Sequence, residues 1–374
     1  MIPHARNPDR KDAHLMYFRI TALSARLCAV SLLLLLCAIP TRAQNLPEWF
    51  QELLQKHIQV TAKDIAGLER GEAVARVLKT TVKKEIAAVG IVRADTSADT
   101  FIEKFRDIIE FKKSPAVEQI GKFSNRPRLE DLKGFTLDPC CLDAIRNCKA
   151  GECDMQMSDE MMDRFRRELN PSVPDYAARA NELTRRILLD YVKAYLQTGN
   201  PALIVYHDQR NAVRLGDEYG SLLVQSRFLA EYTPEFYKYL DGFPKAGSPN
   251  VEDFIYWSKE KYGLKPVLSI THVAIYRRIF ENRTEALIVS KQIYASHYLD
   301  GSLGLTVVVD RNQSQATSGS YLMYLNRFRV GALRGLFVGL KRSVIKSHVR
   351  EGLAKNMRMI RRRLVLPASV AAQP

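Results

Sequence analysis

The stretch EIAAVGIVRADTSADTFIEKFRDI, residues 85–108, reads as a β-strand that runs directly into an α-helix. Small and apolar side chains alternate through residues 85–93, which is the pattern of a strand. Asp95, Thr96 and Ser97 then supply the short polar side chains that cap helix N-termini. We expect a helix over residues 98–111, because one face of it is apolar: Phe101, Ile102, Phe105, Ile108 and Ile109.

The C-terminal third of the chain carries a different pattern, since its apolar residues recur with a period of two after Asn250. This predicts antiparallel strands at residues 253–261, 266–277, 286–299, 302–310 and 319–327. Tight turns at Tyr262-Gly263, Asn282-Arg283 and Asp300-Gly301 would join the first four into a meander.

One long helix is expected to follow, over residues 331–363, with an apolar stripe that includes Leu353 and Met357. Small residues recur along it at every fourth position: Gly331, Gly335, Gly339, Ser343 and Ser347. Each glycine costs roughly 1 kcal/mol in a helix relative to alanine, so the track needs a reason. Either a neighbouring backbone approaches closely, or Gly335 and Gly339 make room for a bound ligand.

The region between these parts reads as a helical insertion over about residues 112–250. Residues 112–155 show little periodicity, and helices are expected at 158–168, 174–197, 217–231 and 234–240, with a short strand at 202–206. A helix at 46–59 and a strand at 73–80 precede residue 85. No Gly/Ser-rich or charged linker sets the insertion off, so we expect one domain over residues 44–366.

The N-terminus resembles an export signal. Residues 27–39 form an uncharged apolar run of the length of a signal-peptide core, followed by a cleavage-like pattern that ends at Ala43. We therefore expect residues 1–43 to be removed, residues 367–374 to be a disordered tail, and the protein to be periplasmic or secreted.

Four cysteines remain after that cleavage, and an oxidising compartment favours disulfides. Cys148 and Cys153 are expected to pair, because Gly151 permits the tight turn between them. Cys140 and Cys141 are adjacent, and a ring between neighbours is strained, so the pairing of these two stays open. A zinc site is the alternative, but the paired Cys-x2-4-Cys spacing is missing, and we expect no metal and no cofactor.

The order of these parts resembles the helix-grip arrangement of the START, Bet v 1 and polyketide-cyclase-like superfamily. Three stretches carry the resemblance: residues 85–108, the strands from Asp253 onward, and VGALRGLFVGLKRSVIKSHV at residues 330–349. The resemblance implies an α+β fold in which a curved antiparallel sheet grips the long C-terminal helix around an apolar cavity. Here a helical insertion, stapled by a disulfide, would be added. No catalytic residue carries over.

Polar residues on the predicted strands are candidates for anchoring a ligand in such a cavity, since pockets are mostly apolar with a few polar groups. Lys291 and His297 interrupt the apolar side of the strand at 286–299, Tyr294 lies on its polar side, and His272 lies on the preceding strand. The alternative is that both histidines are ordinary strand residues with hydrogen-bonded rings.

The charge distribution suggests a surface partner. From Arg327 onward there are twelve Lys and Arg residues against one acid, whereas residues 44–326 balance to zero. We therefore expect an exported carrier of a lipid or other hydrophobic small molecule, whose basic last helix contacts an anionic membrane surface. Nucleic acid is not expected as a partner of an exported protein. The alternatives are a cyclase- or hydrolase-like enzyme that uses a strand histidine, and an envelope interaction protein with no ligand.

Overall fold

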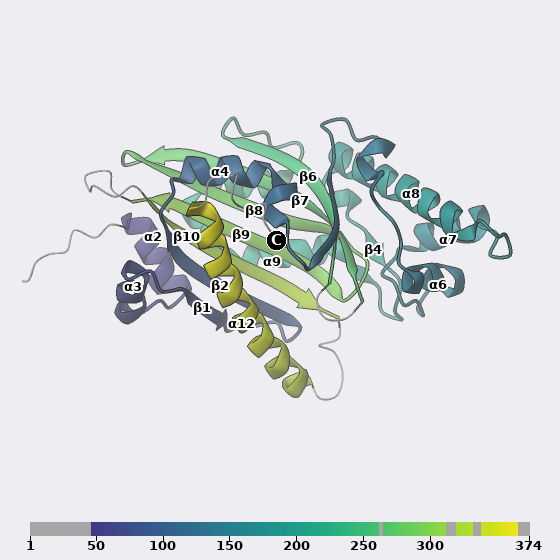
Figure 1. Cartoon of the computed structure of the whole chain (residues 1–374), viewed down its shortest axis with the longest axis horizontal. Coiled ribbons are helices and arrows are strands. Elements are labelled where there is room, and N and C mark those ends of the chain that lie inside the picture. The colour runs from purple at the N-terminus through teal and green to yellow at the C-terminus, as the bar shows by residue number, and fades with distance from the viewer. Residues whose placement is uncertain (1–45, 262–264, 312–318, 332–337, 366–374) are drawn as a thin grey trace, which may run out of the picture. The chain divides into compact units, whose positions relative to one another are not determined.

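A computed structural model describes residues 46–261, 265–311, 319–331 and 338–365 (Figure 1). The predicted signal peptide, the predicted C-terminal tail and Gly335 lie outside these residues. The expected α+β class, with a large antiparallel sheet, a long C-terminal helix and a disulfide-stapled helical insertion, is confirmed.

One antiparallel sheet organises the fold, with eight strands in the order β1-β2-β10-β9-β8-β7-β6-β3. The strands are β1 (Val74–Leu78), β2 (Glu85–Ala94), β3 (Val117–Lys122), β6 (Val251–Glu260), β7 (Val267–Phe280), β8 (Arg283–Ala295), β9 (Leu299–Asp310) and β10 (Ser320–Val330). The last strand, β10, lies beside β2, so the strand that begins the predicted strand–helix unit is paired with the end of the meander.

Helices α4 (Ala98–Arg106), α5 (Ile108–Lys112) and α12 (Val338–Val365) cover one face of this sheet (Figure 1). The side chain of Ser97 accepts a hydrogen bond from the Thr100 amide at 3.2 Å and so caps α4 as the sequence predicts. The helix α12 packs against β1 and β2. Its buried residues Leu353, Met357 and Leu364 share a core with apolar side chains of α4 and the sheet.

A second layer of helices covers the other face, where the larger core lies. Its members are α2 (Glu48–Glu52), the π-helical turn η1 (Leu53–His57), α6 (Pro139–Asn147), α7 (Asp159–Glu168), α8 (Tyr176–Thr198), α9 (Leu215–Gln225), α10 (Phe228–Tyr232) and α11 (Pro234–Gly242). Neighbouring residues of one strand therefore enter different cores, as Leu287 and Ile288 do. We call this group of helices the helical layer.

The smaller elements show where the predicted boundaries were wrong. The strand β3, the helix α6 and the helix α3 (Ala62–Glu69) were not predicted, and β3 pairs with β6 as an edge strand. The predicted helix at 98–111 is two helices, because Asp107 leaves the helical conformation (φ −82°, ψ 71°) and caps α5. The predicted turn at Asp300-Gly301 lies within β9, and the chain turns at residues 296–298 instead.

The Cys148–Cys153 disulfide is present, with Cα atoms 4.6 Å apart, and Gly151 adopts a positive φ of 82° in the turn between them. Cys140 and Cys141 are free thiols at the start of α6, and Cys141 is buried. Burial raises the pKa of Cys141 to about 12, so this thiol stays protonated at neutral pH.

Candidate functional site

Two of the predicted ligand anchors, His272 and Lys291, face each other across neighbouring strands. His272 of β7 and Lys291 of β8 are directly paired in the sheet. They are only 3% and 2% exposed. Both point toward the helical layer, where they meet Tyr195, and not toward α12. Two of the residues selected from the sequence are therefore neighbours in the structure. They lie on the face of the sheet opposite α12, whereas the cavity was predicted between the sheet and that helix.

Tyr195, near the end of α8, joins the two strand residues. The Lys291 Nζ donates to the Tyr195 hydroxyl at 3.2 Å, and that hydroxyl lies 2.9 Å from Nδ1 of His272. The side chain of Asn200, which follows α8, is a second acceptor for Lys291. Gly199, at a positive φ of 72°, ends α8 between Tyr195 and Asn200. The helix end thus delivers both partners of Lys291.

The chain of contacts continues to the molecular surface through Asp253 of β6. The Nε2 atom of His272 lies 3.7 Å from Oδ1 of Asp253, and the Tyr239 hydroxyl of α11 donates to Oδ2 of Asp253 at 2.5 Å. The Asp253 side chain is about one third exposed, whereas Tyr195 is fully buried. We call Tyr195, Tyr239, Asp253, His272 and Lys291 the buried relay.

Burial controls the protonation of the relay. Lys291 is nearly fully buried without a carboxylate partner, and this desolvation lowers its pKa well below the usual value, which favours the uncharged amine. Burial also lowers the pKa of His272, although Asp253 partly opposes this. Burial alone raises the pKa of Asp253, but the nearby His272 ring and a hydrogen bond from Tyr239 more than reverse that effect and lower it.

The order lysine, tyrosine, histidine, aspartate could pass a proton between its members, which is what general acid–base chemistry requires. Access is the obstacle. Tyr195, His272 and Lys291 are almost fully buried, so a substrate would have to displace part of the helical layer to reach them. The ring centroids of Tyr219 and Tyr195 lie 3.8 and 5.0 Å from Nζ of Lys291 and close the site further.

The other predicted anchors lie apart from the relay. Tyr294 faces the helical layer because β8 has an extra residue opposite the step from Ile270 to Thr271, and its hydroxyl donates to the Gln156 carbonyl at 3.1 Å. His297 is buried in the turn after β8, with Nδ1 2.8 Å from the Ser296 hydroxyl. Burial lowers its pKa. Gly339 lies in the first turn of α12, and the structure describes nothing of its surroundings.

A small hollow lies near the start of α6. Its polar lining includes Lys259 and Ser296, and its volume of about 10 Å³ suits a single water molecule. Lys259 reaches Asp138 at 2.8 Å on the same side. This space is far too small for a lipid.

The contact between α12 and the sheet is tight where it passes over Gly90 of β2. A Cβ atom added to Gly90 would lie 2.5 Å from Cγ of Met357 and 3.1 Å from Cγ of Leu353. The glycine that allows a close approach is therefore in the strand. In the described part of the predicted helical track, Ser343 and Ser347 are exposed, and Gly331 lies in a turn directly after β10.

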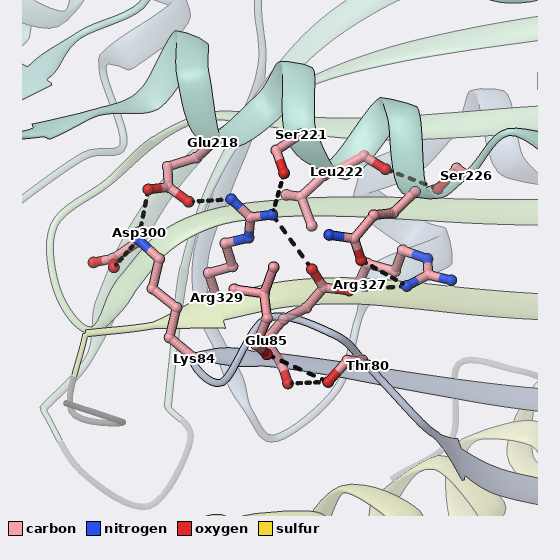
Figure 2. Close-up of polar contacts among 12 residues, drawn as sticks. Thr80, Lys84, Glu85, Glu218, Ser221, Leu222, Ser226, Asp300, Arg327 and Arg329 are labelled. Carbon is pink, nitrogen blue, oxygen red and sulfur yellow. Dashed lines mark hydrogen bonds and ion pairs between the residues drawn. The ribbon is translucent and has the colours of Figure 1, made fainter.

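A second buried polar cluster joins the sheet to α9 (Figure 2). Arg329 of β10 contacts Glu218 of α9 at 2.5 Å and Glu85 of β2 at 3.4 Å, and Arg327 contacts Glu85 at 2.8 Å. Lys84 bridges Glu218 and Asp300. Within the described part of the chain, three cations thus meet three carboxylates in this cluster, and we interpret it as structural.

Comparison of the chain with protein-family models gives no match, and comparison with curated proteins gives none either. Among the described residues, no three or more His, Cys, Asp or Glu side chains are grouped in a way that could hold a metal ion. Within the same ranges, no helix has both the length and the apolar content needed to cross a membrane.

Proposed function

We propose that this chain is an exported protein that binds the anionic surface of a membrane through the outer face of α12. The single observation that carries the proposal is the unbalanced positive charge of that face. Residues 338–365 hold nine Lys and Arg residues and one acid, Glu351. Among the cations of α12 whose side chains the structure describes, four are exposed: Arg350, Lys355, Arg358 and Arg362.

The surroundings of these four cations support this reading. The described ranges give no ion pair between any of them and an acidic side chain, whereas charged residues elsewhere in the fold are extensively paired. The apolar side of α12 is committed to the sheet, because Leu353 and Met357 are buried against β2. The charged side therefore remains for an external partner. Each Lys or Arg near an anionic leaflet contributes about 1 kcal/mol.

The described packing of α12 on the sheet supports docking through the outer face of the helix. Met357 occupies the space over Gly90, and the described hollow near α6 holds about 10 Å³. The lipid-carrier hypothesis and the enzyme hypothesis stay predictions. Organic extraction and mass spectrometry of the natively purified protein test the carrier hypothesis, since a reproducible co-purifying lipid would favour it.

The test of docking is co-sedimentation of the mature chain with vesicles of phosphatidylglycerol and phosphatidylcholine in equal amounts. Replacing Arg350, Lys355 and Arg358 by Gln should weaken binding by about 3 kcal/mol, or more than a hundredfold. The binding of the unaltered protein should fall steeply as salt rises to about 1 M, where the screening length is about 3 Å.

The matched control replaces three exposed cations of the helical layer, Arg167, Arg186 and Lys193, by Gln. Both triple variants lose the same net charge, so a general effect of charge would weaken binding equally in the two. Equal loss, or binding of the unaltered protein to pure phosphatidylcholine with the same affinity, would refute docking by α12.

A further inference from the structure

Within the described ranges, the hairpin between β7 and β8 extends beyond its last pairing with β6 on one side and β9 on the other. The pairing of β7 with β6 ends at Tyr276, and the pairing of β8 with β9 ends at Glu285. Among the described residues, 278–280 pair in the sheet only with 283–285 of the same hairpin, and we call residues 278–283 the finger. Glu281 and Asn282 both have positive φ, as a two-residue hairpin turn requires.

Two apolar side chains are exposed beside the polar turn Glu281-Asn282 at the end of the finger. Ile279 is 67% exposed and Phe280 is 41% exposed, and they are the two residues that directly precede the turn. The guanidinium of Arg278 lies 5.1 Å from the Phe280 ring centroid and turns inward to Glu285, with Nε 2.7 Å from Oε2. The fold thus holds two large apolar side chains outward on a strand pair with a fixed base.

The finger and the basic end of α12 lie against the same short helix, α4. Arg277, at the base of the finger, donates to Asp99 of α4 through two hydrogen bonds of 2.6 and 3.0 Å. Lys104 of α4 donates to the carbonyls of Arg363 and Leu364 at the end of α12. Asp99 and Lys104 are about 8 Å apart along a helix. Through α4, the base of the finger is therefore held near the cationic end of α12.

From this arrangement we infer that the finger inserts Ile279 and Phe280 into the interfacial region of the same anionic bilayer that α12 contacts. The inference rests on the proposed function and adds a hydrophobic anchor to it. Apolar side chains that enter the headgroup boundary add affinity that salt does not screen, beside the electrostatic attraction of nearby cations. Without a bilayer or another partner, the apolar side chains of Ile279 and Phe280 would stay in contact with water.

The experiment measures both affinity and depth on the mature chain with the same vesicles. At about 1 M salt, where electrostatic attraction is screened, replacing Ile279 and Phe280 by Ser should reduce the remaining binding by about tenfold for each side chain. Val224 of α9, which is 63% exposed in the helical layer, provides the control, and Val224→Ser should leave binding unchanged.

The depth of insertion is measured as the quenching of tryptophan fluorescence in the variants Phe280→Trp and Val224→Trp by vesicles that carry brominated acyl chains. The natural tryptophans, Trp49 and Trp257, are buried and set the common background. Quenching of the Phe280→Trp variant alone supports insertion. Equal quenching of both variants, or none while binding persists, overturns insertion and leaves docking by α12 standing.

Two further outcomes distinguish insertion of the finger from self-association of the protein and from a failure of docking. A concentration-dependent dimer without vesicles, lost on replacement of Ile279 and Phe280 by Ser, would make a second copy the partner of the finger and overturn the inference. Absence of any vesicle binding by the unaltered protein would overturn the proposed function and the inference together.

Discussion

The contact of α12 with β2 can be tested by filling the one position where the helix comes closest to the sheet. In Gly90→Ala, the added Cβ would lie 2.5 Å from Cγ and 2.9 Å from Sδ of Met357. Overpacking of this kind costs about 1–3 kcal/mol, and alanine recovers about 0.5–1 kcal/mol because glycine is unfavourable within a strand. We expect a net loss of up to about 2.5 kcal/mol in the free energy of unfolding.

The second substitution makes room for the first. Met357 is 1% exposed, so Met357→Ala alone should cost about 2–5 kcal/mol through the lost side chain and the cavity. In that background the tight contact that remains is with Cγ of Leu353 at 3.1 Å, so Gly90→Ala should stabilise by at most about 0.5–1 kcal/mol. The interaction energy of the double-mutant cycle is therefore about 1–3 kcal/mol.

Urea denaturation of the unaltered protein, the two single variants and the double variant gives the interaction energy from the midpoints and slopes of the unfolding transitions. Gly304→Ala in β9 is the control, because its added Cβ would have no atom closer than 3.4 Å and should not couple to Met357. Additivity of Gly90→Ala and Met357→Ala within about 0.5 kcal/mol would refute the tight packing. It would mean that a space exists between α12 and the sheet, as the carrier hypothesis requires.

Three further predictions concern buried groups. Lys291→Met should raise the free energy of unfolding at neutral pH, because burial lowers the pKa of Lys291 and the unfolded chain therefore binds one more proton than the folded chain. In urea denaturation, the stability of the unaltered protein should rise as the pH increases toward about 10.4, whereas the stability of the variant should not. Glu285→Leu should cost about 3–5 kcal/mol in the same assay, because it leaves Arg278 without its partner at 2.7 Å, whereas a loss under 1 kcal/mol would refute the pairing. Cys148→Ser should lower the free energy of unfolding by about 2 kcal/mol, since the bridge spans a sequence separation of only five, and reduction of the unaltered protein should match it.

The parts of the fold that depend on local chemistry were predictable. The cap at Ser97 and the positive-φ residue Gly199 mark helix ends through hydrogen bonds within a few residues, so the sequence around them contains the information. The long strands were also found. The strand β3 was missed because it is a partly buried edge strand with the sequence VEQIGK, which has little apolar alternation.

The relay could be predicted only in part, for a physical reason. A lysine or histidine among apolar strand residues is costly to bury, and this cost singles out Lys291 and His272. Their common partner, Tyr195, is 77 residues from His272 in the sequence, and nothing in the spacing pairs them. The face was also ambiguous, because both faces of the sheet are buried and alternation in β8 does not say which face meets α12.

The difference between buried and exposed charge gives the proposed function its physical basis. Lys84, Arg327 and Arg329 meet as many carboxylates in their cluster, so their charge is used within the fold and exerts little field outside it (Figure 2). Arg350 and Arg358 of α12 are exposed on a helix with one acid. A helix whose apolar side is already buried gains nothing for stability from concentrated like charge, which repels itself. That charge lowers the free energy only when an anionic surface lies against it.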